Sequence, residues 1–293
     1  VSSRPANDAS ISFPSSVFSS PETSGSIKSR DIRESSGLAF SRCQENVLWT
    51  HNDSDDGPFI FALDPQGNDL GTWKVTGSEN VDWEDIAAFK DTDGSCYLLI
   101  ADTGNNYRKR DVLKVYRVRE PVVEASNTRR SRRNASTTSP AESFSFSYED
   151  ISQDVETIMV YPFTGDIYIV SKNLTSAAGV YKLPPFSVGQ HVTAVRVGQI
   201  SVPAVPNGLL TGGDISPDGK RVAVCDYFGA YEISLPEGAE KFDDIWSERA
   251  IGFDIGRRAQ GEAITYTNDS NTLYATSEKR GSPIFRVTRI LNR

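Results

Sequence analysis

Acidic residues recur at matching places along the chain, and their spacing could support metal chemistry. Glu84, Glu156 and Glu262 stand in short segments of similar sequence, and Glu34 and Asp214 stand in related ones. Carboxylates around one narrow space raise one another's pKa unless a cation or a basic group neutralises them. Ca²⁺ takes about six to eight oxygen ligands, so these residues are the predicted ligands and Ca²⁺ is the predicted ion. The alternative is that each carboxylate only accepts hydrogen bonds from turn amides.

A second set of candidates follows strongly apolar runs, where a strand is predicted to end. His51 and Asp53 follow Val47-Leu-Trp-Thr, Lys172 follows Ile167-Tyr-Ile-Val-Ser, and Tyr227 follows Val222-Ala-Val-Cys-Asp. A histidine or a carboxylate of raised pKa can act as a base, a lysine can neutralise negative charge, and a tyrosine can transfer protons. These are the predicted catalytic residues. With only two histidines in the chain, Zn²⁺ is a weaker candidate than Ca²⁺.

Repeated β-strands must position both sets. Period-2 and continuous apolar runs bounded by Gly, Asp and Asn dominate, which is typical of strands. A unit of an acidic strand, a strongly apolar strand and a third strand occurs five times. The five openings are Glu34-Ser-Ser-Gly-Leu-Ala-Phe40, Asp82-Trp-Glu-Asp-Ile-Ala-Ala88, Asp154-Val-Glu-Thr-Ile-Met-Val160, Thr211-Gly-Gly-Asp-Ile-Ser216 and Gln260-Gly-Glu-Ala-Ile-Thr-Tyr266. This pattern predicts an all-β fold, a single five-bladed β-propeller, with a two-sheet sandwich as the alternative.

The ring is predicted to close with a strand from the N-terminus. The fifth unit ends after its third strand, so its fourth strand is expected within Ser10–Ser29. Residues 1–33 are therefore the closing segment, and 34–293 are the propeller. Residues 121–142, rich in Ser, Thr, Asn and Arg, indicate a disordered insertion. Its Arg129-Arg-Ser-Arg-Arg133 run fits a mobile charged loop, a site for a dibasic-cleaving protease, or a patch for polyanions.

The topology of a propeller unit would bring the candidate residues to one end of the channel. The first strand lines the channel and the second runs antiparallel to it, so acidic openings and polar strand ends converge at one mouth. Asp82 and Asp154 precede Glu84 and Glu156 by two residues, which places each pair on the same side of its strand. Cys43 and Cys96 fall in equivalent turns of adjacent units on the opposite face, where they could form a disulfide. Cys225, in an apolar strand, is predicted to be a buried free thiol.

Composition limits the partners and the compartment. The 293 residues carry a net charge of −8, which argues against wrapping nucleic acid. No apolar run approaches the roughly 18 residues of a membrane helix. The paired cysteines and four glycosylation sequons favour a secreted glycoprotein, expected to be a monomer that binds a small molecule or carbohydrate at the central channel. The sequons begin at Asn52, Asn134, Asn173 and Asn268.

Several motifs resemble a widespread group of secreted, largely uncharacterised β-propeller proteins. They are Glu34-Ser-Ser-Gly-Leu-Ala39, Leu48-Trp-Thr-His-Asn-Asp53, Asp82-Trp-Glu-Asp-Ile-Ala87, Gly165-Asp-Ile-Tyr-Ile-Val-Ser-Lys172, Gly213-Asp-Ile-Ser-Pro-Asp-Gly219 and Gln260-Gly-Glu-Ala-Ile264. The acidic strand openings are more loosely similar to calcium-centred propellers of the phytase-like, paraoxonase-like and SdiA-regulated families. Those are typically six-bladed, whereas this sequence has five units. The resemblance implies channel-facing metal ligands at Glu84, Glu156 and Glu262.

Three functional hypotheses follow. The first is a Ca²⁺-dependent hydrolase of an ester, lactone or phosphoester at the channel mouth, with His51 or a carboxylate as the base. The second is a polysaccharide lyase or glycosidase, in which Lys172 or the cation neutralises an acidic sugar. The third is a lectin-like or protein-binding propeller without catalysis. The polar strand ends differ strongly between units, which favours one asymmetric site and ranks the hydrolase first.

Overall fold

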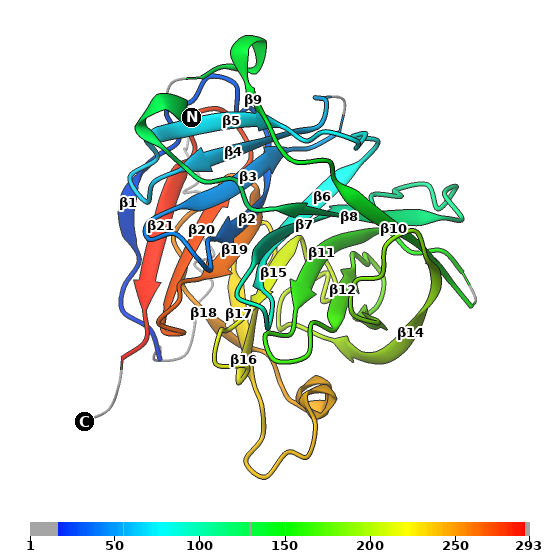
Figure 1. Cartoon of the computed structure of the whole chain (residues 1–293). Coiled ribbons are helices and arrows are strands. Elements are labelled where there is room, and N and C mark those ends of the chain that lie inside the picture. The colour runs from blue at the N-terminus through cyan, green and yellow to red at the C-terminus, as the bar shows by residue number, and fades with distance from the viewer. Residues whose placement is uncertain (1–16, 55, 129, 150, 291–293) are drawn as a thin grey trace, which may run out of the picture.

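The fold is all-β and propeller-like (Figure 1). The computed structural model describes residues 17–54, 56–128, 130–149 and 151–290. Their strands form four hydrogen-bonded sheets, of which one has eight strands and joins two of the repeat units. Helical structure in these ranges is limited to three 3-10 segments, and none of them has the length or apolar character needed to cross a bilayer.

The strands group into antiparallel units in chain order. Unit 1 contains β2 Ser35–Phe40, β3 Leu48–Asn52, β4 Phe59–Leu63 and β5 Asp69–Lys74. Unit 2 contains β6 Trp83–Lys90, β7 Cys96–Asp102, β8 Leu113–Arg119 and β10 Glu142–Tyr148. Unit 3 contains β11 Val155–Val160, β12 Ile167–Ser171, β13 Ala178–Leu183 and β14 His191–Ile200. Unit 4 contains β15 Gly212–Ile215, β16 Arg221–Cys225, β17 Ala230–Ser234 and β18 Ile251–Phe253. The last unit contains β19 Gly261–Tyr266, β20 Thr272–Ser277, β21 Pro283–Thr288 and β1 Glu22–Ser26.

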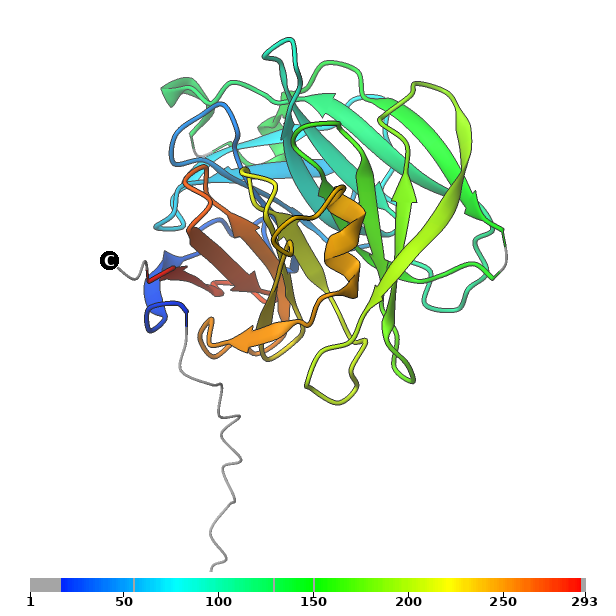
Figure 2. The same cartoon turned by 90° about the horizontal axis from the view of Figure 1, so that it is seen from below.

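The first strands of the units surround a common centre. β2 lies beside β6, β6 beside β11, β11 beside β15, β15 beside β19, and β19 beside β2. At the periphery, β10 pairs in parallel with β14, which joins units 2 and 3 into the eight-stranded sheet. The 3-10 segment η3, Phe242–Ser247, packs against β14 and β17 (Figure 2). The first and the last described strands lie side by side in the last unit, where β1 pairs antiparallel with β21 (Figure 1).

Apolar side chains fill the spaces between neighbouring units. Trp49 and Trp73 of unit 1 pack with Trp83 of unit 2 in one buried cluster. Fully buried aromatic and β-branched residues on both faces of each sheet explain the continuous apolar runs in the sequence. Burial between sheets fixes the register of each first strand, because a slip of one residue would turn its apolar side chains to the other face. The first strands can therefore hold polar side chains at fixed positions around the centre.

A disulfide links units 1 and 2, as predicted. Cys43, in the turn between β2 and β3, is bonded to Cys96 at the start of β7, with the Cα atoms 6.2 Å apart. Cys225 is a buried free thiol, which confirms the prediction for it. The disulfide lies at the end of the units opposite the starts of the first strands, because both cysteines stand where a first strand gives way to a second.

Residues 121–142 differ from the disorder expected of them. Their described part contains the 3-10 segments η1, Ala125–Asn127, and η2, Arg132–Asn134, followed by β9, Ser136–Thr137. β9 adds a parallel strand to the outer edge of β5. Arg132 forms ion pairs with Asp31 and Asp56. This Ser- and Arg-rich segment has few apolar side chains to bury. Backbone pairing with β5 and the ion pairs of Arg132 hold it in place instead.

Candidate functional site

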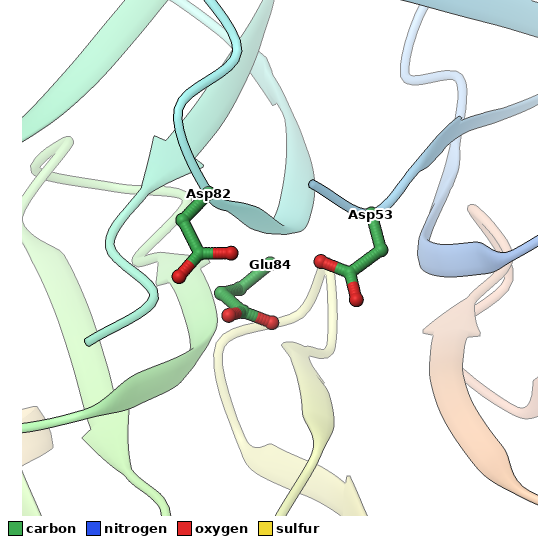
Figure 3. Close-up of side chains that lie close together, drawn as sticks. All are labelled: Asp53, Asp82 and Glu84. Carbon is green, nitrogen blue, oxygen red and sulfur yellow. The ribbon is translucent and has the colours of Figure 1, made fainter. Parts of the chain in front are cut away.

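Three carboxylates from units 1 and 2 converge at one end of the ring. We call this end, where the first strands begin and the second strands end, the mouth. Asp53 follows β3, Asp82 precedes β6, and Glu84 lies in β6. Their carboxylate groups point toward one another (Figure 3). One oxygen of each lies within 4.8 Å of an oxygen of the others.

A second group of carboxylates overlaps the first. Oxygens of Glu84, Asp154 and Glu156 also lie within 4.8 Å of one another, and all three side chains are buried. Glu84 therefore belongs to both groups, and we refer to the five residues together as the carboxylate cluster. Asp154 accepts a hydrogen bond from the backbone N–H of Asn105 at 2.7 Å, which orients its carboxylate. Two of the predicted ligands, Glu84 and Glu156, are in the cluster.

Crowding and burial make these acids weak. Burial, followed by the charge of Glu156, raises the pKa of Glu84 well above its ordinary value. Burial raises the pKa of Glu156 to about 7, although the nearby Lys172 opposes the shift. Burial and the charge of Asp53 raise the pKa of Asp82 to about 6. Near neutral pH the cluster therefore holds protons unless a cation replaces them.

The last unit extends the acidic surface of the mouth. Burial and the charge of Glu156 raise the pKa of Glu262 to about 9. Glu262 accepts one hydrogen bond from Gln260, while its buried Oε2 has no partner among the described residues. Burial and the charge of Asp53 raise the pKa of Glu278, which follows β20, to about 7. Glu262, a predicted ligand, thus lies within electrostatic reach of the cluster without joining either group.

Lys172 supplies positive charge at the centre of the mouth. Its Nζ donates a hydrogen bond to Glu156 Oε1, and the pair is nearly buried, with side chains 17% and 4% exposed. Burial alone would lower the pKa of Lys172, but Glu156 outweighs it, so the pKa rises and the amine stays charged. Tyr227 is half-buried within electrostatic reach of Lys172, Glu262 and Glu156, and burial raises its pKa. The structure brings Asp53, Lys172 and Tyr227 to the mouth together.

His51 is placed differently from the expectation. Its imidazole is fully buried between units 1 and 2, edge-on to Trp83 at a centroid distance of 5.7 Å. Nδ1 contacts the backbone oxygen of Asn52 at 2.9 Å, and the ring also interacts with the backbone of Asp85. Burial lowers the pKa of His51, which favours the neutral form. A ring with no exposed surface packs the interface between the units and has no path to a ligand at the mouth.

Asp214 and Glu34 lie outside the cluster. Asp214 Oδ2 accepts hydrogen bonds from Arg42 at 2.8 Å and from the backbone N–H of Tyr266 at 2.9 Å. Arg42 follows β2 and Tyr266 ends β19, so this carboxylate is directed to the end of the ring opposite the mouth. The prediction of Asp214 as a ligand is corrected, because its charge is already paired there. Glu34 precedes β2, is exposed, and joins neither carboxylate group.

Asp85 fills the centre of the ring, a role that the sequence analysis did not assign. Its side chain is 1% exposed. Oδ1 accepts a hydrogen bond from its neighbour Ile86 N–H at 2.8 Å, and Oδ2 accepts one from Ile158 N–H of unit 3 at 3.0 Å. The inner edges of the first strands have no further strand to pair with, so a carboxylate satisfies their N–H groups. Asp85 thereby links β6 of unit 2 to β11 of unit 3 inside the ring.

The signal for the remaining cluster residues was present in the repeats. Asp82 and Asp154 precede predicted ligands by two residues, and the period of a strand places them on the same side. Glu278 occupies the strand-end position of the last unit that corresponds to Asp53 in unit 1. The equivalence of Glu278 and Asp53, which both follow the second strand of their unit, is the sequence signal for Glu278.

Comparison with known proteins bears mainly on the fold. No protein-family model matches the sequence. No curated protein matches it either. Among solved structures, the chain is similar to a gluconolactonase from Xanthomonas campestris, with a TM-score of 0.50 and 11% identity, over 92% of this chain and 89% of that chain. It is also similar to a hydrazine synthase from Kuenenia stuttgartiensis, with a TM-score of 0.41 and 14% identity, over 86% of this chain and 57% of that chain. The likeness to the gluconolactonase concerns the propeller-like fold alone.

Proposed function

We propose that this protein is a secreted five-bladed propeller that hydrolyses an ester, lactone or phosphoester with the help of Ca²⁺ bound at the mouth. The convergence of Asp53, Asp82, Glu84, Asp154 and Glu156 carries this proposal. The blade number rests on the units of four antiparallel strands and on the closed succession of their first strands. β1 would complete the last blade with its fourth strand by pairing with β21.

The cluster fits a hard cation. Calcium–oxygen bonds of about 2.3–2.6 Å allow two ligand oxygens to lie up to about 5 Å apart. The separations within each group, up to 4.8 Å, satisfy this limit. The donors are carboxylates without a thiol or an imidazole, which favours Ca²⁺ over Zn²⁺. The raised pKa values of Glu84 and Glu156 also fit, since an ion would supply the charge that protons otherwise supply.

The residues around the cluster suit hydrolysis. A bound cation would polarise the carbonyl or phosphoryl oxygen of the substrate. Glu278 belongs to neither ligand group, and its pKa of about 7 suits a group that takes a proton from water near neutral pH. Lys172 stays charged and can neutralise developing negative charge, while Tyr227 can donate a hydrogen bond to a leaving oxygen. His51 has no part in this proposal because it is buried.

Two further observations support the remaining parts of the proposal. The Cys43–Cys96 disulfide is typical of an oxidising compartment and supports a secreted protein. The sequon at Asn134 is exposed, whereas Asn52 is 2% exposed and donates hydrogen bonds through its amide. Among the substrate classes, lactones merit the first assay, because the solved structure of similar fold is described as a gluconolactonase.

The test measures turnover and its dependence on calcium. Purified protein is assayed with gluconolactone, 4-nitrophenyl acetate and 4-nitrophenyl phosphate, with calcium and after chelation. We expect hydrolysis of at least one class with calcium, at least a hundredfold loss with Glu84→Gln, and a large loss of kcat with Glu278→Gln. Glu45→Gln, an exposed residue in the β2–β3 turn at the opposite end, is the matched control and keeps full activity.

Other outcomes decide against the hydrolase. Turnover that is indifferent to chelation and to Glu84→Gln contradicts the proposed site. A protein that binds calcium and a carbohydrate without turning over any substrate is a lectin-like binding module. The charged Lys172 beside Tyr227 favours one further candidate, a lyase or glycosidase acting on acidic sugars. Cleavage of an oligouronate with loss of activity in Lys172→Ala identifies that enzyme.

A further inference from the structure

A pocket rich in arginine is formed by the segment before β2 and the segment of η2. It has a volume of about 600 Å³, and its lining residues are Arg30, Asp31, Arg33, Ser131, Arg132 and Arg133. Arg30 and Arg33 precede β2, and the other arginines come from the segment of η2. We refer to it as the arginine pocket. Its walls combine two parts of the chain that are about a hundred residues apart in sequence, as in the bond from Arg132 N–H to Asp31.

The arginines of this pocket differ in how their charge is used. Arg132 is neutralised by ion pairs with Asp31 and Asp56, which hold the segment of η2 against unit 1. Arg30, Arg33 and Arg133 are exposed and have no acidic partner among the described residues. Like charges gathered on one side of a protein repel one another and destabilise the folded state. Three unpaired guanidinium groups at one pocket therefore favour the binding of an anion that neutralises them. Guanidinium groups match the oxygen atoms of phosphate and sulfate with paired hydrogen bonds.

One side chain connects the arginine pocket to the mouth. Asn52 Oδ1 accepts hydrogen bonds from the backbone N–H groups of Arg33 and Glu34, at 2.8 and 3.1 Å. Its Nδ2 donates to the backbone oxygen of Asp31 at 2.8 Å and to the carboxylate of Asp56. The next residue, Asp53, belongs to the carboxylate cluster. The buried Asn52 therefore holds one wall of the arginine pocket, the backbone before β2, at a point one residue from Asp53.

We propose that the arginine pocket binds a phosphate or sulfate group of the substrate, and so selects anionic esters for hydrolysis at the mouth. The role of the pocket in selecting a substrate rests on the proposed function, whereas its binding of an anion does not. A carboxylate carries one negative charge, whereas three unpaired guanidinium groups suit a tetrahedral dianion with several acceptor oxygens. The anionic group would hold one end of the molecule while its ester extends toward the carboxylate cluster.

The first experiment measures anion binding alone, without calcium or turnover. Metal-free protein is titrated with inorganic phosphate, sulfate and acetate by calorimetry at low ionic strength. We expect phosphate or sulfate to bind at least ten times more tightly than acetate does. The anion with the higher affinity, phosphate or sulfate, identifies the group that the pocket selects. The triple variant R30A/R33A/R133A should bind at least tenfold more weakly. The matched control removes three positive charges far from the mouth, at Arg119, Arg196 and Lys220, and should bind as the native protein does.

The outcomes separate this inference from the proposed hydrolase. Absence of phosphate and sulfate binding overturns it, as does an equal loss of binding in the triple variant and its control. Acetate binding as tight as that of phosphate overturns the choice of a tetrahedral dianion. Because the three arginines are exposed, the triple variant should unfold at the same temperature as the native protein, and Arg133→Ala alone provides a milder second variant.

A second experiment connects the arginine pocket to turnover. Phenyl acetate and 4-acetoxyphenyl sulfate present the same ester with and without a distal anion. We expect the triple variant to raise KM for the charged ester at least tenfold while KM for phenyl acetate and both kcat values stay the same. An equal effect on both esters contradicts a subsite for the anion. Absence of turnover of any ester by the native protein refutes the proposed function and leaves the anion titration to decide the arginine pocket.

Discussion

The carboxylate of Asp85 gives the sharpest test of how the centre of the ring is built. It is 1% exposed and accepts hydrogen bonds from the N–H groups of Ile86 and Ile158, at 2.8 and 3.0 Å. In Asp85→Ala both donors lose their acceptor inside the ring. Each buried donor without a partner costs about 1–3 kcal/mol, so the variant should lose about 2–6 kcal/mol of unfolding free energy. The total unfolding free energy of a protein domain is about 5–15 kcal/mol, so this loss is a large part of it.

Equilibrium unfolding in urea, followed by tryptophan fluorescence, measures the loss. Asp85→Asn retains one acceptor oxygen but presents an amide donor to a second N–H, so it should lose about half as much. Asp91→Ala is the control, because Asp91 accepts a backbone hydrogen bond from Thr92 in an exposed turn, and it should lose less than about 1 kcal/mol. A loss in Asp85→Ala no larger than that of the control would refute the reasoning that Asp85 satisfies the inner strand edges.

Three further predictions concern the mouth and the disulfide. The raised pKa values of Asp82 and Glu156, about 6 and 7, mean that the folded, metal-free protein binds protons that the unfolded chain releases. Its unfolding free energy, measured in urea with chelator, should therefore fall by a few kcal/mol from pH 5 to pH 8, and a flat profile contradicts this. Replacing Cys43 and Cys96 by Ala removes a bond that spans 53 residues and should cost about 4 kcal/mol in the same assay, whereas a loss below about 1 kcal/mol would not fit. In Lys172→Ala, Glu156 loses its ion pair, so the pH at which calcium binding is half-maximal should rise; an unchanged midpoint is the opposing result.

The repeats made most of the fold predictable. Continuous apolar runs located many of the strands, because the sheets bury both faces against their neighbours. The equivalent turn positions of Cys43 and Cys96 anticipated their bond. The convergence of Glu84 and Glu156 followed from the antiparallel order of the strands within a unit. These features depend on local pattern and topology, which a sequence carries directly.

The errors arose where one residue of register decides the direction of a side chain. Asp214 directly precedes Ile215, and Asp85 directly precedes Ile86, so the two aspartates hold equivalent positions. Both accept hydrogen bonds from backbone N–H groups of a neighbouring first strand, rather than facing the mouth. The alignment of the units contains this equivalence, and it places Asp214 one residue away from the position of Glu84, Glu156 and Glu262. Successive side chains of a strand point to opposite faces, so that offset reverses the direction.

His51 and the segment 121–142 were misjudged for a different reason. The polar neighbours Asn52 and Asp53 suggested an exposed histidine, but β3 still packs against unit 2 at this point and Trp83 covers the ring. The Ser- and Arg-rich segment has the composition of a disordered chain, and its order depends on Asp31 and Asp56 from distant parts of the sequence. Contacts between units and between distant segments are set by tertiary packing, which neither periodicity nor composition reports.

Calcium titration with a count of released protons tests the central claim most directly. Binding to the metal-free protein is measured by calorimetry at pH 6.5 in two buffers that differ in ionisation enthalpy. Because Glu84 and Glu156 hold protons without a cation, we predict that calcium binds, that protons are released on binding, and that Glu84→Gln abolishes both effects. Calcium binding that releases no protons, binding unaffected by Glu84→Gln, or no binding at millimolar calcium would contradict a cation site in the carboxylate cluster.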